Sequence, residues 1–440
     1  MQKISGMNFP YYIAQKVAFS GKKSFSRLII RIATVAVALS VAVMIITTAV
    51  VRGFKNQISD KIFGLWGQIH ITDASINQSA ETTPVDTKQT FYPSLDTLRQ
   101  LEYLVPNKNI FTSKSDPYIS KKTNGGIHHI QVFAVKSGII KTKDEIEGIV
   151  LKGAGRDFDT TFMQKSLVAG RFIKFKDSTA SRDIIVSQYT ANRLKIKVND
   201  KFVIHFLDQN QQQLKRAFTV CGIYKTGLEE YDKKIAFVDL GIIQELLGWK
   251  KNQVAGFEVF VDNFADIEPL TEHIHNEVLP NNLYAETIRD KFPSIFEWLD
   301  LQNINETVIV VLMAIVAIIN MITALLILIL ERTEMIGILK SFGTNNWTIR
   351  KIFLYHAAII VGTGLFFGNL FGLSVCYLQE KYKFIKLSET DYYLSYAPIE
   401  LHLPTVLILN LATLLMVVLF LIVPTYLITR ISPVRAIRIK

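Results

Sequence analysis

Apolar residues in this chain gather into four long runs separated by more polar sequence. The runs Ile32 to Val51, Thr307 to Leu330, Ile352 to Leu378 and Leu403 to Thr429 contain no Asp, Glu, Lys or Arg. At about 1.5 Å of rise per helical residue, each run reaches about 30 Å or more, the thickness of a bilayer's hydrocarbon core. Core helices of soluble proteins are seldom this long without a charge, and the apolar region of a signal peptide is shorter. The pattern therefore predicts four transmembrane helices, at residues 32–51, 307–330, 352–378 and 403–429.

The distribution of charge predicts which segments lie in the cytoplasm. The N-terminal segment 1–31 has six basic residues and no acidic ones, the tail 430–440 has four and none, and the loop 331–351 has four basic and two acidic residues. These segments together carry +12 and the whole chain carries +11, so the rest is close to neutral. Basic segments beside transmembrane helices stay in the cytoplasm, which places both termini there. The basic character is thus a signal of membrane topology, and no nucleic-acid recognition motif accompanies it.

The segment 52–306 and the short loop 379–402 then lie outside the cytoplasm. The longer segment can bury its own core, and it contains a single cysteine, Cys221, so no disulfide can form within it. Polar stretches at 77–90 and 174–182 suggest a division into two lobes. Alternating or β-branched residues predict strands at 68–73, 129–135, 183–187, 201–206, 217–224, 235–238 and 257–261, and helical periodicity predicts helices at 191–196, 240–247 and 267–278. The predicted fold is a membrane protein with four transmembrane α-helices and a large α+β domain of two lobes inserted between helices 1 and 2.

Motifs for catalysis and nucleotide binding are absent from the sequence. It contains no G-x-x-x-x-G-K-[ST], no G-x-S-x-G and no H-E-x-x-H. Two histidine pairs, His128-His129 and His273-x-His275, are poorly placed for chelation, because neighbours on a strand point to opposite faces and residues two apart on a helix do not meet. We therefore expect no catalytic residue, no metal and no cofactor in this chain.

The loop 331–351 has the features of a docking element. If the second run continues as a helix, Gly343 is suited to end that helix, and Thr344 or Asn345 to begin the next. The continued helix would carry an apolar face at i, i+3, i+4 and i+7: Met335, Ile338, Leu339 and Phe342. Such a hairpin either docks a cytoplasmic partner or lies on the membrane surface.

Small and polar residues within the apolar runs predict contacts between helices. Gly364, Gly368 and Gly372 are spaced by four and form a smooth stripe that lets another helix approach closely. Pro424 should kink the fourth helix near its cytoplasmic end. Four polar residues at membrane depth should face other helices or a wet cavity: Asn320, His356, Asn369 and Asn410.

Four segments of the chain carry recognisable patterns: E-R-T-E-M-I-G-I-L-K-S-F-G at 331–343, D-Y-Y at 391–393 followed by Ala397-Pro398, P-V-R-A-I-R at 433–438, and the opening stretch from Tyr12 to Phe54. The first is similar to the coupling loop of the MacB and FtsX superfamily of ABC-transporter permeases. The other three, with it, resemble the lipoprotein-releasing members of that superfamily, the LolC and LolE type. The resemblance covers essentially the whole chain in order.

The resemblance implies a non-catalytic permease subunit in the bacterial inner membrane, with its large domain in the periplasm. Such a chain pairs with a second protomer, identical or related, and binds a cytoplasmic ATPase dimer that holds ATP and Mg. Closure of the ATPases is transmitted through the coupling loop to the periplasmic domains, which release lipoproteins to a periplasmic carrier. Extraction of a lipoprotein from the membrane costs about 0.8 kcal/mol for each acyl methylene that leaves the lipid, which is why it would need ATP. The alternatives are MacB-like export of small amphipathic compounds or peptides, and FtsX-like signalling to a periplasmic hydrolase.

The resemblance also implies roles for particular residues. On the coupling loop, Glu334 and Lys340 would make polar contacts with the ATPase, Leu339 an apolar one, and Gly343 would set the bend. Gly337 also matches the superfamily pattern and completes this docking set.

Two further sites follow from the same resemblance. The turn from Leu207 to Arg216 corresponds to a hairpin that can receive the carrier, although here it is rich in Gln and lacks proline. It lies beside the family stretch Gly222 to Asp232. The lipid-handling cavity would lie between the first and second helices, with these candidate acyl contacts: Val43, Ile46, Met313 and Ile319.

Overall fold

The computed structural model describes residues 9–19, 25–75, 83–107, 118–141, 146–176, 179–207 and 212–431. The chain divides into two compact units. The helical bundle comprises residues 1–56, 298–386 and 396–440, and the outer domain comprises residues 57–297 together with the short segment Leu387–Ser395.

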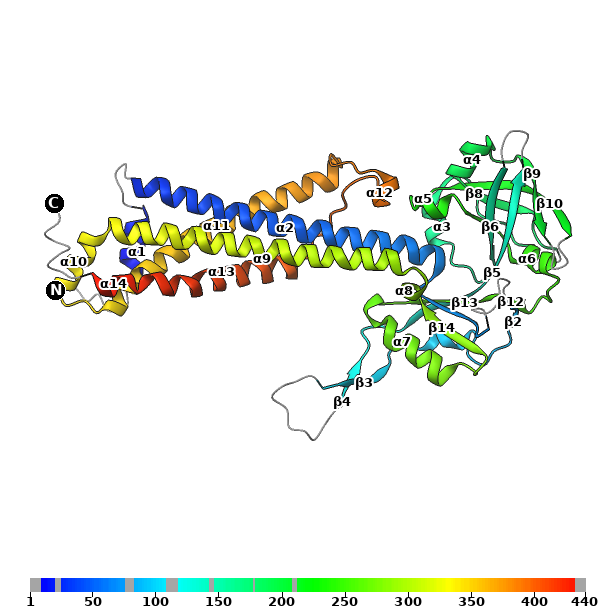
Figure 1. Ribbon diagram of the computed structural model, residues 1–440, viewed down its shortest axis with the longest axis horizontal. Helices are drawn as coiled ribbons and strands as arrows, with labels where there is room; N and C mark the ends of the chain where they lie inside the picture. Colours follow the sequence, from blue (N-terminus) through cyan, green and yellow to red (C-terminus); the bar gives the residue numbers. More distant parts are fainter. Residues whose placement is uncertain are drawn as a thin grey trace. The chain divides into compact units, whose positions relative to one another are not determined.

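Four long helices form the bundle (Figure 1). They are α2 (Phe25–Trp66), α9 (Pro293–Glu331), α11 (Asn346–Tyr382) and α13 (Leu403–Thr425), and each supplies a segment long and apolar enough to cross a membrane. Three of them contain their predicted runs in full, and the fourth run, 403–429, is divided between α13 and the short helix α14 (Leu427–Arg430). The helix α2 continues 15 residues past the run that predicted it, and α9 begins 14 residues before its own. Arg52 ends the apolar run, and Lys55 and Lys61 follow it, but none of them ends the helix, because Arg and Lys are good helix formers. With 42 residues, α2 is about 63 Å long, twice the hydrocarbon thickness.

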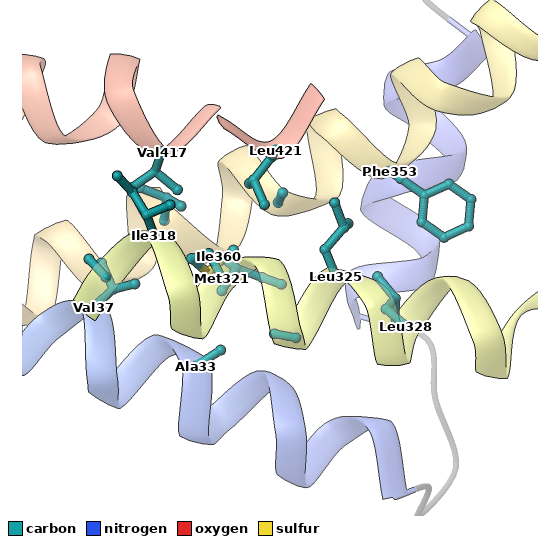
Figure 2. Packing of buried hydrophobic residues seen from close by; sticks show 14 of the residues in the cluster. Ala33, Val37, Ile318, Met321, Leu325, Leu328, Phe353, Ile360, Val417 and Leu421 are labelled. Atoms are coloured by element: carbon teal, nitrogen blue, oxygen red, sulfur yellow. The ribbon is translucent and has the colours of Figure 1, made fainter. Parts of the chain in front are cut away.

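The core of the bundle is built from apolar side chains of all four long helices (Figure 2). Val37 of α2, Met321 of α9, Ile360 of α11 and Leu421 of α13 are among the buried members. Three short helices complete the described bundle: α1 (Phe9–Phe19), which packs on α11, α10 (Thr333–Ser341) and α14 (Leu427–Arg430). Pro424 was expected to kink the fourth helix, and α13 ends one residue after it.

A ten-stranded mixed sheet forms the outer domain, in the order β14-β1-β13-β5-β6-β11-β8-β10-β7, with β9 pairing with β10 and β5. Its strands are β1 (Ile69–Asp73), β5 (Ile127–Lys141), β6 (Ile146–Ala154), β7 (Leu167–Gly170), β8 (Asp183–Ser187), β9 (Lys201–Leu207), β10 (Gln213–Tyr224), β11 (Ile235–Asp239), β13 (Gly256–Val261) and β14 (Leu283–Thr287). The two predicted lobes share this one sheet, because the 15-residue strand β5 pairs with β13 along its first half and with β6 and β9 along its second. The expected α+β domain is confirmed, as one compact unit.

Smaller elements surround the sheet. Two short ladders pair β2 (Val85–Asp86) with β12 (Gln253–Val254) and β3 (Glu102–Pro106) with β4 (Tyr118–Lys122). The helices are α3 (Thr161–Ser166), α4 (Gln188–Leu194), α5 (Glu229–Asp232), α6 (Leu240–Leu247), α7 (Ile267–His273), α8 (Ile288–Lys291) and α12 (Glu389–Tyr392), with 3-10 turns at Ser94–Thr97 and Phe264–Asp266 and a π turn at Ile274–Val278. Apolar residues of α4 and α6 pack on the sheet and form one core with β5, β8, β10 and β11.

Candidate coupling and docking sites

The turn between α10 and α11 is set by its local sequence. Gly343 has φ +80°, and the amides of Gly343 and Thr344 donate to the carbonyls of Lys340 (3.0 Å) and Leu339 (3.1 Å). This pair of hydrogen bonds around a left-handed glycine is a common way for a helix to end. The side chain of Asn345 accepts a hydrogen bond from the amide two residues further on, at 3.2 Å, and so caps α11. Gly343 therefore lies at the bend, where the sequence placed it.

The apolar face predicted for this helix is divided between the bundle and the surface. Met335 and Leu339 pack against the bundle core, whereas Ile338 is 43% exposed and Phe342 82% exposed. Trp347, in the first turn of α11, is also exposed, at 48%. The i, i+3, i+4 and i+7 spacing did not predict which of these residues are buried and which are exposed. Residues at opposite edges of one broad helical face can point toward different surroundings.

The remaining predicted docking residues also differ in their exposure and contacts. Glu334 is exposed, and Gly337 is buried. The ammonium group of Lys340 donates to the carbonyls of Ile428 and Ile431, at 2.7 Å each. Ile428 lies within α14 and Ile431 directly follows it, so Lys340 adds side-chain hydrogen bonds to the carbonyls at the C-terminal end of this helix. Gly337, Leu339 and Lys340 thus make packing or capping contacts within the bundle, and their predicted contact with the ATPase stays a prediction.

The stripe of glycines on α11 lies against α2. Gly364, Gly368 and Gly372 are all buried. A Cβ atom on Gly368 would lie 2.7 Å from the carbonyl oxygen of Ala38 and 2.9 Å from Cβ of Val41, closer than real Cβ contacts come. The absence of a side chain is thus what permits the two helices to approach at this point.

Two of the polar residues at membrane depth join neighbouring helices. Asn369 of α11 and Asn410 of α13 exchange two hydrogen bonds, of 2.7 and 2.9 Å. Each also donates to the carbonyl four residues earlier in its own helix. Among the described residues, His356 is buried with no hydrogen-bond partner for either ring nitrogen, and Asn320 is half-buried.

The four candidate acyl contacts lie in two environments. Ile46 and Met313 pack on the bundle core, Val43 is half-buried, and Ile319 is 56% exposed. Ile319 belongs to an exposed apolar stripe that follows one face of α9: Leu301, Ile304, Val308, Val311, Leu312, Ile315 and Ile319. The described part of the chain leaves this stripe uncovered.

The candidate carrier hairpin is only partly described. Leu207 ends β9 and is 56% exposed, and Arg216 lies within β10, half-buried, opposite Ile204. The tip of the turn, residues 208–211, lies outside the described residues. Within the described residues, no group of three or more His, Cys, Asp or Glu is placed to hold a metal ion.

A buried charge cluster in the outer domain had no counterpart in the sequence analysis. Lys152 of β6 and Glu258 of β13 form an ion pair of 2.6 Å, with side chains 1% and 0% exposed. Gln131 donates to the same carboxylate at 2.8 Å, and the Lys152 ammonium also donates to the carbonyl of Leu65. Burial lowers the pKa of Lys152 and raises the pKa of Glu258, while their mutual attraction opposes both shifts.

A second part of this cluster holds the last turn of α2. The Nε2 atom of His70 contacts the carbonyl of Trp66, and its Nδ1 accepts from Lys291 at 2.6 Å. Burial, and then the charge of Lys291, bring the pKa of His70 well below its usual value, which keeps the ring neutral. The Lys152 ammonium lies 4.7 Å from the centre of the Trp66 ring. Lys152 and His70 thus satisfy the carbonyls of Leu65 and Trp66 at the end of the helix, and Lys291 contacts the other nitrogen of the His70 ring.

Comparisons with known proteins cover nearly the whole chain. The MacB-like periplasmic core domain family matches residues 32–277, and the FtsX-like permease C-terminal family matches residues 307–433. The lipoprotein-releasing system transmembrane proteins LolC and LolE of Haemophilus influenzae are each 21% identical, LolC over 83% of this chain and 84% of its own length, LolE over 93% and 94%. The LolC protein of Neisseria meningitidis is 23% identical over 81% of this chain and 77% of its own length.

One solved structure, the extracellular domain of the noncanonic ABC-type transporter YknZ from Gram-positive bacteria, covers 36% of this chain at 17% identity and a TM-score of 0.26, too low to support an argument. The two family matches lie in the order outer domain, then helices, as the fold requires. The chain therefore belongs to the MacB and FtsX family of ABC-transporter permeases, of the LolC and LolE type.

Proposed function

We propose that this chain is the transmembrane subunit of a transporter in which a separate ATPase drives the release of lipoproteins from the inner membrane to a periplasmic carrier. The observation that carries the proposal is the match to LolE of Haemophilus influenzae, a lipoprotein-releasing system transmembrane protein, over 93% of this chain and 94% of that protein. In this proposal both termini and α10 lie in the cytoplasm, because the basic segments flank the helices on that side.

The ATPase would dock on the surface formed by Glu334, Ile338, Phe342 and Trp347. Three large exposed apolar side chains and an exposed carboxylate lie on α10, at its C-cap and in the first turn of α11, and exposed apolar groups of this kind are typical of contact surfaces because water does not stabilise them. Gly343 supports the surface indirectly, since its left-handed backbone ends α10 and turns the chain into α11. ATP and Mg would be held by the ATPase and not by this chain.

A second permease protomer would cover the apolar stripe of α9. Four helices are too few to enclose a path for a lipoprotein, and the stripe from Leu301 to Ile319 is continuous along the helix. Within it, Ile319 is the acyl-contact candidate with the most accessible side chain. Leu207 and Arg216 remain the candidates for carrier contact on the β9–β10 hairpin.

Reconstitution tests the function directly. The chain, its ATPase and a labelled triacylated lipoprotein are placed in proteoliposomes, and the periplasmic carrier is added outside. We expect ATP-dependent transfer of the lipoprotein to the carrier. Vigorous ATP hydrolysis without transfer would refute lipoprotein release and favour export of small amphipathic compounds, whereas activation of a periplasmic hydrolase would favour signalling.

Copurification tests the docking surface. Phe342→Asp should weaken capture of the ATPase by about 30-fold or more, since a central aromatic anchor contributes about 2 kcal/mol or more to a contact. Phe384→Asp is the matched control, because Phe384 is 55% exposed but lies beyond the other end of α11. Full capture by the Phe342 variant would contradict the docking assignment.

A further inference from the structure

The connection between α11 and α13 folds onto the outer domain. Its central residues, Leu387–Ser395, group with that domain and not with the helices on either side. The Lys225 ammonium lies 2.6 Å from the Glu389 carboxylate, and the Lys61 ammonium donates to the carbonyl of Tyr393 at 2.8 Å. Two stretches that carried the family resemblance, one after β10 and the other the D-Y-Y segment, therefore meet in space although they are more than 150 residues apart in sequence.

The loop of the outer domain that receives this segment is held by hydrogen bonds to one carboxylate. The carboxylate of Asp232 accepts hydrogen bonds from the hydroxyl of Thr226 (2.7 Å) and from the amides of Thr226 (3.1 Å) and Gly227 (3.2 Å). Gly227 has φ +79°, and a Cβ atom there would lie 2.7 Å from the Lys61 ammonium. The loop thus presents a fixed surface on which Lys61 and the incoming segment are held together.

The two legs of the connection are fastened to the helices of the bundle. Gln379, in the last turn of α11 and 1% exposed, donates to the carbonyls of Ala397 (2.9 Å) and Ile385 (3.3 Å) and accepts from the amide of Ile385 (2.9 Å). Further along, the Asn56 amide of α2 donates to both carboxylate oxygens of Glu400, at 2.9 and 2.7 Å. The two flanking parts of the connection, residues 379–386 and 396–400, are therefore hydrogen-bonded to the bundle within a few residues of the segment that contacts the outer domain.

We infer that residues 379–400 are a latch that passes movement of α11 and α13 to the outer domain, a second route beside the continuous helices α2 and α9. The inference rests on the proposed ATP-driven function. A displacement at the end of α11 is carried by the fastened legs to the Lys225–Glu389 and Lys61–Tyr393 contacts. Opening these contacts leaves the ATPase able to bind and hydrolyse ATP while the outer domain responds less.

Charge exchange across the latch tests this inference. The full-length permease with its ATPase is placed in nanodiscs, with spin labels at Val168 of β7 and Leu415 of α13, which are 53% and 61% exposed. The ATP-dependent change in the distance between the labels is compared in Lys225→Glu, in Glu389→Lys and in the double variant. Loss of one ion pair shifts a conformational population by about fivefold or less, and reversal of one charge adds repulsion between like charges. We therefore expect the ATP-dependent change in the distance between the labels to be at least about twofold smaller in each single variant.

The double variant should restore the change, with ATP hydrolysis and melting temperature close to those of the unmodified complex. The matched control is Lys234→Glu, which removes an exposed pair with Glu230 of 3.5 Å on the same loop and should have no effect. Unchanged distances in both single variants, or a double variant that fails to recover, would overturn the latch. If a reversal variant fails to fold, Lys61→Met removes only one donor and supplies the same comparison.

The distance change is measured without lipoprotein, so it separates the two hypotheses. A normal latch response in a complex that releases no lipoprotein would refute the proposed function alone. Lipoprotein release that proceeds at full rate per ATP in both reversal variants would refute the latch alone.

Discussion

The buried ion pair at the end of α2 permits a quantitative prediction. In Lys152→Met, a side chain of similar length keeps the packing but leaves the Glu258 carboxylate without its cation, in a site that is 0% exposed. The carbonyl of Leu65 loses its donor as well. Removing one member of a buried pair costs about 3–5 kcal/mol, because the remaining charge stays desolvated and uncompensated. For a domain of this size, that free energy corresponds to a fall in melting temperature of about 6–20 °C.

The assay is thermal unfolding of the purified full-length protein, followed by tryptophan fluorescence. Trp66 lies against the Lys152 ammonium and reports on the site itself. Lys234→Met is the control, since its exposed pair with Glu230 contributes less than about 1 kcal/mol. In the double variant Lys152→Met with Glu258→Leu, no charge is left buried, so it should melt at a higher temperature than either single variant. A Lys152→Met protein that melts within about 2 °C of the unmodified one, or a double variant that is the least stable of the three, would refute the reasoning.

Three more predictions concern the helices and the latch. Gly368→Val should destabilise the full-length protein by about 1–3 kcal/mol through overpacking against α2, whereas Gly362→Val, where a Cβ atom would meet nothing within 4 Å, should have a much smaller effect on the melting temperature. Asn369→Leu should destabilise the protein more than Asn369→Leu combined with Asn410→Leu, because the single change leaves the side-chain oxygen of Asn410 without its donor at membrane depth. Equal melting temperatures would contradict this. Hydrogen bonds from its lysine partner and a serine hold the pKa of Glu389 below its usual value. The contribution of Glu389 to stability is therefore full at neutral pH and is lost as the pH falls through the lowered pKa. The melting temperatures of Glu389→Gln and of the unmodified protein should differ at pH 7 and converge in acid.

Local sequence determined much of the architecture. The four uncharged runs predicted the four long helices, because length and apolar composition are sufficient to specify a membrane span. Gly343 predicted the stop of the helix that precedes α11, and Asn345 is the one of the two predicted caps, Thr344 and Asn345, that begins α11, since capping involves only residues within one turn. The break at Arg332 that separates α9 from α10 was not predicted. Within the outer domain, the predicted strand 183–187 and helix 240–247 coincide with β8 and α6.

The tertiary structure decided what lies far apart in sequence. Lys152 and Glu258 meet across more than 100 residues, and Lys225 and Glu389 across more than 150, so no periodicity or local motif could pair them. The same holds for the division of the α10 face, where Leu339 packs inward and its neighbour Ile338 points outward only because the bundle occupies one side. Hydrophobic pattern and capping act over a few residues and therefore specify the elements, whereas burial and charge pairing depend on which elements become neighbours.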